Sequence, residues 1–217
     1  MQLFAHHFSS YCQKVLIALY ENETPFEFRD LSPEHPDNNV AFERLWPLKK
    51  MPILVDGERT VMEATIIIEY LDLHHAGRTL MLPADPRAAL EVRLMDRFFD
   101  NYVMTPMQRI VFDALRPQDD RDPYSVDDAR KLLDNAYAWL DRHMTGRQWA
   151  ALDTFSLADC AAAPSLFYAD WVQPLGERFA NVRAYRQRLL ARPSFARAVD
   201  EARRYRHFFP LGAPDRN

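Results

Sequence analysis

Ser9-Ser10-Tyr11-Cys12 joins a short apolar strand pattern, Leu3-Phe4-Ala5, to an amphipathic helix pattern that continues from Val15. A side chain on such a strand-to-helix turn is exposed, and it lies beside the unpaired N–H groups and the positive dipole end of the helix. Anions, thiolates included, are stabilised at such a place. The turn is therefore the first candidate for a functional site.

The hydrophobic period on either side of this turn changes repeatedly between that of strands and that of helices. Asp56-Gly57 is the strongest hairpin signal in the chain, and it separates two strand patterns. Gly77 is expected to cap the helix before it. The expected elements are strands at Gln2–Ala5, Phe26–Phe28, Ile53–Val55 and Thr60–Met62, and helices at Ser10–Glu21, Val40–Trp46 and Ala64–His75. Their order, β-α-β-α-β-β-α, predicts a small α/β domain with a mixed sheet.

Only helix patterns follow from about residue 85 onward. A long pattern covers Arg87–Leu115, and Pro106 is expected to bend this helix. Asn181 and Ser194 are expected to cap the last two helices. The remaining helices are expected at about 125–144, 156–170, 182–191 and 195–206. This half of the chain is predicted to be all-helical.

Ser156-Leu157-Ala158-Asp159 has the form of a capping box, in which the serine hydroxyl bonds the amide of Asp159 and the aspartate bonds back. Phe155 and Cys160 occupy the two positions of a hydrophobic staple around it. Cys160 is therefore assigned to packing. Since Cys12 lies far away in the sequence, the two cysteines make no disulfide framework, and a reducing compartment fits best.

Bulk composition limits the class of protein. With 217 residues, of which 48% are hydrophobic and 27% charged, the chain can bury one or two sizeable cores. The net charge of −4 gives no indication of nucleic-acid binding. The residues after Met1 have no basic and apolar leader pattern, so we expect no secretory signal. No uninterrupted apolar run approaches the roughly 18 residues that a membrane span needs. We expect a soluble, cytoplasmic protein with no membrane or nucleic-acid partner.

Two further stretches, Lys50–Gly57 and Glu63–Leu71, complete a pattern that resembles the glutathione S-transferase family, in its serine-type, bacterial-like or zeta-like cytosolic form. The resemblance covers nearly the whole chain. It implies an α+β two-domain fold with a thioredoxin-like βαβαββα glutathione-binding domain at residues 1–77, a linker at 78–84 and an all-helical domain at 85–217 that contributes the electrophile site. Relatives are homodimers, so a homodimer is expected. Glutathione would be a substrate, and the reaction would need no metal.

Ser9 is the first choice for the catalytic residue, with Ser10 next. A serine ahead of a helix is most often only an N-cap. The spacing of Ser9 and Cys12 resembles the Cys-x-x-Cys of thioredoxin-like folds, and serine-type transferases use the hydroxyl at this place to bond the glutathione sulfur. Tyr11 is an alternative, as in other branches of the family, and Cys12 is either a buried small hydrophobe or a resolving thiol.

The resemblance also implies the glutathione contacts. A cis bond at Met51-Pro52 would turn the backbone of Met51 toward the cysteinyl part, and Lys49 or Lys50 would meet the glycyl carboxylate. The family's usual Glu-Ser pair, which binds the γ-glutamyl carboxylate, is Glu63-Ala64 here. The hydroxyl is missing, so the backbone amides of Ala64 and Thr65 remain, and the Thr65 side chain is a possible replacement.

The second substrate is expected between the domains, against the long helix. The candidate residues for this electrophile site are Tyr11, Tyr102, Met104, Met107 and Arg109, although such a stripe is more often core. His6, His7 and Cys12 lack zinc-site spacing, so no metal is expected.

The resemblance implies a glutathione S-transferase of the kind used in detoxification, which activates the glutathione thiol as a thiolate for attack on an electrophilic small molecule. A zeta-like glutathione-dependent isomerase and a non-catalytic adaptor of the stringent-starvation type are the alternatives.

Overall fold

The computed structural model describes all residues from Met1 to Asn217. Its first part is a four-stranded sheet in the order β2-β1-β3-β4, with β1 parallel to β2 and antiparallel to β3. The elements are β1 (Gln2–Ala5), α1 (Ser10–Glu21), β2 (Glu27–Asp30), α2 (Pro36–Leu45), β3 (Ile53–Asp56), β4 (Arg59–Met62) and α3 (Ala64–His74). This is the predicted mixed sheet and the predicted order.

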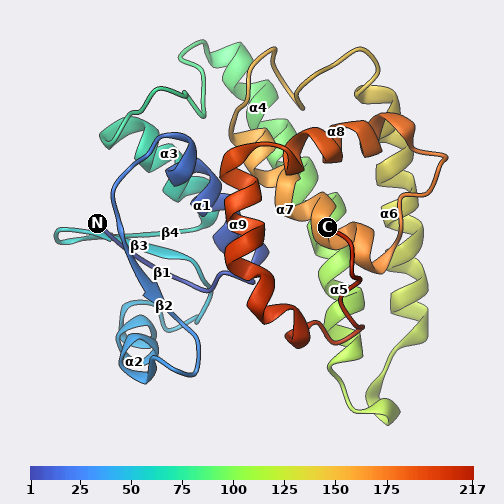
Figure 1. Cartoon of the computed structure of the whole chain (residues 1–217), viewed down its shortest axis with the longest axis horizontal. Coiled ribbons are helices and arrows are strands. Elements are labelled where there is room, and N and C mark those ends of the chain that lie inside the picture. Colours follow the sequence, from blue (N-terminus) through green and yellow to red (C-terminus); the bar gives the residue numbers. More distant parts are fainter.

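Alternation along the strands decides which helix covers which face of the sheet. Phe4 and Ile53 pack with Phe42 of α2 on one face. Leu3 and Leu54 belong to the large core on the other face, where α1 and α3 lie. Figure 1 shows α2 separated from α1 and α3 by the sheet.

The second part is helical throughout. Its elements are α4 (Pro86–Phe98), a π-helical segment η1 (Phe99–Met104), α5 (Thr105–Ala114), a short turn η2 (Gln118–Asp120), α6 (Pro123–His143), α7 (Leu157–Val172), α8 (Ala180–Leu190), α9 (Pro193–Ala202) and a 3₁₀ segment η3 (Arg203–Phe208). The predicted fold class, an α/β domain followed by an all-helical domain, is confirmed. The predicted linker at 78–84 falls between α3 and α4.

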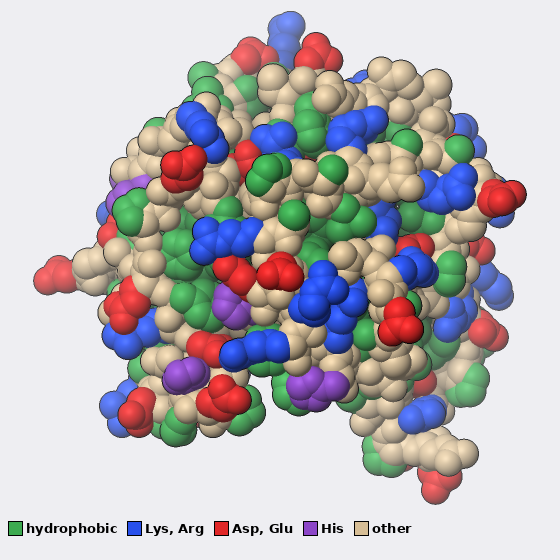
Figure 2. Space-filling view, viewed as in Figure 1, with side chains coloured by type: hydrophobic (Ala, Val, Ile, Leu, Met, Phe, Trp, Pro, Cys, Tyr) green, Lys and Arg blue, Asp and Glu red, His purple; other side chains and the backbone are tan.

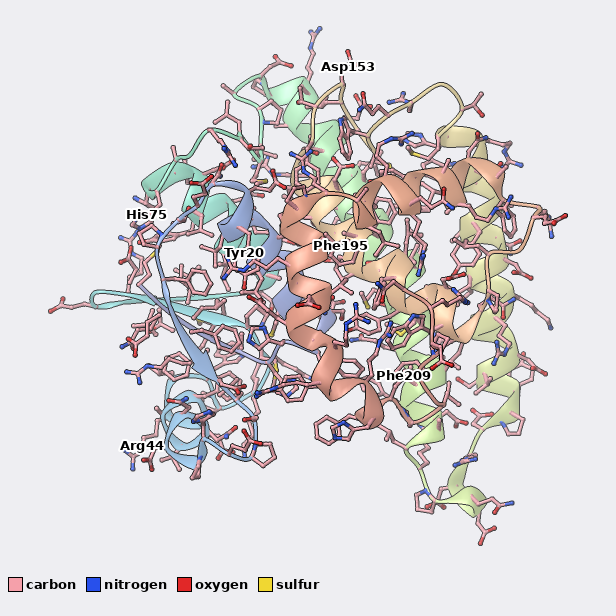
Figure 3. The ribbon with its side chains drawn as sticks, in the orientation of Figure 1. Tyr20, Arg44, His75, Asp153, Phe195 and Phe209 are labelled. Carbon is pink, nitrogen blue, oxygen red and sulfur yellow. The ribbon has the colours of Figure 1, made fainter.

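Helix α1 joins the two parts, because it packs on the sheet with one side and on α7 and α9 with the other. The buried apolar residues of the two parts accordingly form one continuous core. Tyr20 near the end of α1 donates a hydrogen bond to Glu201 Oε2 of α9 (2.6 Å), and Figure 3 shows Tyr20 beside that helix.

The long helix expected at 87–115 differs from the prediction. It changes to π-helical geometry over Phe99–Met104, so its irregularity begins before Pro106, which lies in the first turn of α5. The Thr105 hydroxyl donates to the backbone oxygen of Asp100 (2.9 Å) within this segment. Such π turns add a residue to a helix and are frequent at functional sites.

Three predicted caps are wrong. Helix α3 ends at His74, and Gly77 instead allows a close approach, since a Cβ there would lie 2.4 Å from the side chain of Asn22. Asn181 lies inside α8, where its backbone N–H and its side-chain amide donate to Asp141 of α6. Ser194 lies inside α9, where its hydroxyl donates to Glu21. Asn181 and Ser194 thus use their polar side chains to bond neighbouring helices, and they do not cap their own helices.

The capping box at the start of α7 is confirmed. Both hydrogen bonds between Ser156 and Asp159 are present, with 2.9 Å from the Ser156 N–H to Asp159 Oδ2. The other oxygen, Asp159 Oδ1, accepts from the backbone of Ala150 (3.0 Å) and from the Tyr185 hydroxyl (2.5 Å). Cys160 is fully buried, as its assignment to packing requires.

Candidate functional site

Ser9 is the N-cap of α1. Its backbone is extended (φ −78°, ψ 126°), and its Oγ accepts a hydrogen bond from the Cys12 N–H at 3.4 Å. Accepting this bond leaves the hydroxyl proton of Ser9 free to donate to another group. Ser10 is the first residue of the helix and is nearly buried.

A polar cavity of about 440 Å³ opens beside Ser9. The structure brings eight residues singled out from the sequence to its walls: Ser9, Tyr11, Lys49, Lys50, Met51, Pro52, Glu63 and Ala64. The peptide bond between Met51 and Pro52 is cis, as predicted. The residues come from the starts of α1 and α3 and from the segment before β3, far apart in sequence.

A second polar cavity of about 510 Å³ adjoins the first and shares Tyr11, Glu63, Ala64, Arg97 and Asp100 with it. Thr65 lines this second cavity. The two form one continuous groove lined mainly by polar and charged residues, here called the polar groove, which runs from the start of α1 and the segment before β3 to the space between α3 and α4.

The start of α3 lies at the centre of this groove. Glu63 precedes the helix with a φ of 68°, a left-handed conformation that is uncommon for a residue other than glycine. Its side chain makes no capping hydrogen bond. The first N–H groups of α3, including those of Ala64 and Thr65, have no acceptor within the helix. They are available to an anion in the groove.

A buried charge cluster closes the floor of the groove. The ammonium of Lys14 lies 2.5 Å from Asp96 Oδ1 and donates to Asp100 Oδ2 and to Thr65 Oγ1, both at 2.9 Å. The side chains of Lys14 and Asp96 are each only 1% exposed. Burial raises the pKa of Asp100, against the lowering effect of the Lys14 charge. The cluster ties α1 to α3, α4 and η1.

A third, mainly apolar cavity of about 300 Å³ lies on the other side of Ser9. Met107 and Ser10, two of the candidates from the sequence, line it. Phe8, Tyr168 and apolar residues from the end of α5, from the position after it and from the C-terminal segment line the rest, among them Val111, Phe112, Leu115, Phe208 and Phe209. Figure 3 labels Phe209, which follows η3. Ser9, Gln108 and Phe112 line both this cavity and the first polar one.

Three of the electrophile-site candidates line none of these cavities. Met104 is buried in the core, and Arg109 faces α6, where it pairs with Asp128 at 3.1 Å. Tyr102 is exposed and packs against Phe98. The structure therefore assigns these three side chains to packing and to the surface.

Tyr11 faces the polar groove instead of the apolar cavity. Burial raises the pKa of the Tyr11 phenol to about 12. The phenol is therefore protonated at neutral pH and can donate a hydrogen bond in the groove.

Cys12 is completely buried, and its sulfur accepts a hydrogen bond from the backbone of His6 at 3.5 Å. Burial raises the pKa of the Cys12 thiol to about 12, which disfavours the thiolate that reactive cysteines need. His6 packs on Tyr205, and His7 stacks on Phe28. No group of three or more His, Cys, Asp or Glu side chains is arranged to hold a metal ion.

Sequence reasoning missed Lys14, Asp96, Arg97, Asp100 and Gln108. Lys14 carried one usable signal, because it stands between Cys12 and the apolar run from Val15. A lysine on a face that is otherwise buried needs a partner for its charge. The acidic partners lie more than eighty residues away, so the sequence alone does not indicate them.

Comparisons with known proteins agree with this arrangement. Residues 3–79 match the model of the glutathione S-transferase N-terminal domain, and residues 103–193 match that of the C-terminal domain. Glutathione S-transferase GstB of Escherichia coli K12 is 27% identical over 202 residues, covering 91% of this chain and 96% of that protein. A stringent starvation protein A homolog of Coxiella burnetii is 24% identical over 206 residues, covering 93% and 92%.

Among solved structures, a glutathione S-transferase from Methylobacterium radiotolerans in complex with glutathione sulfonate is similar, with a TM-score of 0.79 and 29% identity. The match covers 91% of this chain and 93% of that one. None of the helices combines the length and the apolar character that crossing a bilayer requires.

Proposed function

Because this chain belongs to the glutathione S-transferase family, we propose that it binds glutathione in the polar groove and ionises its thiol beside Ser9. The thiolate then attacks an apolar electrophile, which joins the glutathionyl group to that substrate by addition or with loss of a leaving group such as chloride. One observation carries this proposal. Ser9 lies where the polar cavity and the apolar cavity meet. A sulfur held at that point would touch the hydroxyl, the start of α1 and the second substrate together.

The energy that this activation needs is within reach of the site. A free thiol has a pKa near 8.5, and lowering it by about two units requires about 2.7 kcal/mol of preferential stabilisation of the thiolate. A hydrogen bond to a charged group contributes about 1.5–3 kcal/mol. The helix N-terminus adds about 0.3–1 kcal/mol. Ser9 and the start of α1 can therefore supply what is needed.

The rest of glutathione follows from this placement of the sulfur. The backbone of Met51 would pair with the cysteinyl part, and Lys49 or Lys50 would meet the glycyl carboxylate. The γ-glutamyl end would then lie at the start of α3, near Glu63 and the amides of Ala64 and Thr65. All of these residues line the polar groove.

Calorimetric titration with glutathione tests the binding, and a conjugation assay with an activated aryl chloride tests the transfer. Ser9→Ala should lower conjugation strongly while leaving the fold unchanged, whereas Ser10→Ala should do much less. If Ser10→Ala is the more damaging change, the activating hydroxyl is assigned to the wrong serine. An isomerase would use the same thiol without consuming glutathione, so product analysis separates it from a transferase.

A second candidate function is that of an adaptor without catalysis. The similarity to the stringent starvation protein homolog and the missing hydroxyl at Ala64 favour it. The arginines of α8, α9 and η3 give it little support, since basic and acidic side chains are mixed on this face (Figure 2). Arg192 pairs with Glu21, and Arg197 pairs with Glu201. Absence of glutathione binding in the titration would favour the adaptor.

We also propose a homodimer, formed through the outer face of α3 and α4. Ile66 and Leu73 on α3 and Leu90 and Leu94 on α4 are exposed, at helical spacings that place each pair on one side of its helix. Exposed apolar groups that gather on one surface mark interaction sites. Sedimentation equilibrium tests this proposal, and Leu94→Glu should shift the protein toward the monomer.

A further inference from the structure

At the start of α3, where the proposed function places the γ-glutamyl carboxylate, the usual side-chain donor is missing. Ala64 has no hydroxyl. The neighbouring hydroxyl of Thr65 is already engaged, because it donates to Asp96 Oδ2 (3.0 Å) and accepts from Lys14 (2.9 Å) and Arg97 (2.6 Å). Thr65 therefore has no free proton to offer an incoming carboxylate. If glutathione binds here, another side chain must supply the charged hydrogen bond.

Arg97 is placed to do so, and we infer that its guanidinium binds the γ-glutamyl carboxylate in place of the missing hydroxyl. This inference rests on the proposed function. Arg97 lies on α4 and lines both polar cavities, as Ala64 does. The two residues therefore border the same part of the groove from opposite sides.

One edge of the guanidinium is held rigidly, and the other is free. Arg97 Nε donates to Asp96 Oδ2 at 3.0 Å, and Nη2 donates to Asp96 Oδ2 at 2.6 Å and to Asp100 Oδ2 at 2.5 Å. Nη1 makes no hydrogen bond to the protein, so two N–H groups remain for a ligand. An arginine fixed in this way loses little further freedom when it binds a carboxylate.

The charges around Arg97 fit a zwitterion. Lys14 and Arg97 balance Asp96 and Asp100, so the cluster itself is neutral. Glu63, which also lines both polar cavities, forms no ion pair and no side-chain hydrogen bond. The γ-glutamyl end of glutathione carries a carboxylate and an ammonium on one carbon. Arg97 suits the first and Glu63 suits the second.

A thermodynamic cycle between protein and ligand tests this assignment. The affinities of the wild-type protein and Arg97→Gln are measured by calorimetry for glutathione and for an analogue that lacks only the α-carboxylate of the γ-glutamyl residue. The wild type should bind glutathione about ten to a hundred times more tightly than the analogue, as expected for one hydrogen bond between charged groups. In Arg97→Gln this preference should fall by about tenfold or more, leaving only the part that the amides of Ala64 and Thr65 supply.

Two further variants keep the test decisive. Arg93→Gln removes the same charge from the wall of the second cavity, but Arg93 is paired with Glu69 and does not line the first. It should leave the preference for the carboxylate within about twofold of the wild type. Arg97→Lys keeps the charge that balances Asp96 and Asp100, so it serves if Arg97→Gln fails to fold. It should also lose most of the preference, since the single ammonium of lysine cannot pair with Asp96 and Asp100 and also present a separate nitrogen to the ligand, as Arg97 does with Nη1.

The outcomes separate this inference from the proposed function. A wild type that binds neither ligand contradicts the proposed function itself. A wild type that binds glutathione tightly, together with an Arg97→Gln variant that keeps the full preference for the carboxylate, overturns the inference and leaves the function standing. If Arg97→Gln and Arg93→Gln each lower the affinities for glutathione and for the analogue by the same factor, the substitutions have only a general effect of charge. That result would also overturn the inference.

Discussion

Replacing Lys14 by methionine should destabilise the protein far more than the loss of an ordinary ion pair. The side chain of Lys14 is 1% exposed, and its ammonium faces Asp96, Asp100 and Thr65 within 2.9 Å. Methionine fills similar volume but leaves two buried carboxylates with only Arg97 as a cationic partner. Removing one partner of a buried pair costs about 3–5 kcal/mol, because the remaining charge is buried without compensation.

Part of that cost can be relieved by protonation. Burial already raises the pKa of Asp100, and loss of the Lys14 charge would raise it further. We therefore expect a loss near the lower end, about 3 kcal/mol. For a chain of this size such a loss lowers Tm by about 6–12 °C. Since the cluster joins α1 to the helical domain, both domains should be affected together.

Urea unfolding, followed by circular dichroism and tryptophan fluorescence, measures the change in the free energy of unfolding. Arg93→Gln is the matched control, because the Arg93–Glu69 pair has similar distances (2.9 and 2.7 Å) but an arginine that is 46% exposed. Exposed pairs contribute about 0.2–1 kcal/mol. A Lys14→Met variant no less stable than Arg93→Gln would refute the view that this cluster holds the domains together.

Three further predictions concern the groove and the turn before α1. Ala64→Ser should tighten glutathione binding by at most about 1.5–3 kcal/mol, and by less if Arg97 already holds the carboxylate; calorimetry measures it, and a weaker complex would contradict the placement of the γ-glutamyl end. Cys12 and Cys160 should resist alkylation in the native protein and react in urea, since burial raises the pKa of both thiols; mass spectrometry counts the adducts, and rapid native labelling of Cys12 would contradict its burial. Burial lowers the pKa of His6 and of His7 below the usual value of 6.5. At a pH near or below 6.5 both imidazoles are therefore protonated more readily in the unfolded state than in the folded state. Stability should therefore fall as the pH drops from about 7.5 to about 5.5, and less so in a variant with glutamine at both positions; an identical fall in that variant would rule these histidines out as the cause.

The parts of the site that the sequence predicts are those encoded by neighbouring residues. Ser9 stands at a strand-to-helix turn, and Met51-Pro52 stands just before a strand, so their places follow from local patterns. Glu63 and Ala64 stand at the start of a helix for the same reason. The fold then brings these three segments together in one cavity, as the resemblance implies.

The parts that the sequence does not predict depend on distant pairing and on a change of helix type. Lys14 meets Asp96 and Asp100 only after the helical domain has packed on α1. The sequence predicts one long helix bent at Pro106, and it gives no sign of the π segment at Phe99–Met104. Of the candidates on this helix, Met107 lines the apolar cavity and Met104 is buried in the core. Which side of the helix faces the cavity depends on how the helical domain packs, and helical spacing alone does not give it.

The central claim is that Ser9 stabilises the thiolate of bound glutathione. The most direct test is the pKa of that thiol, measured from the ultraviolet absorbance of the thiolate in the binary complex as the pH is varied. We predict a pKa about two units below the value near 8.5 of a free thiol for the wild type and for Ser10→Ala, and a return toward the free value for Ser9→Ala. A bound thiol whose pKa is the same in the wild type and in Ser9→Ala would contradict the claim.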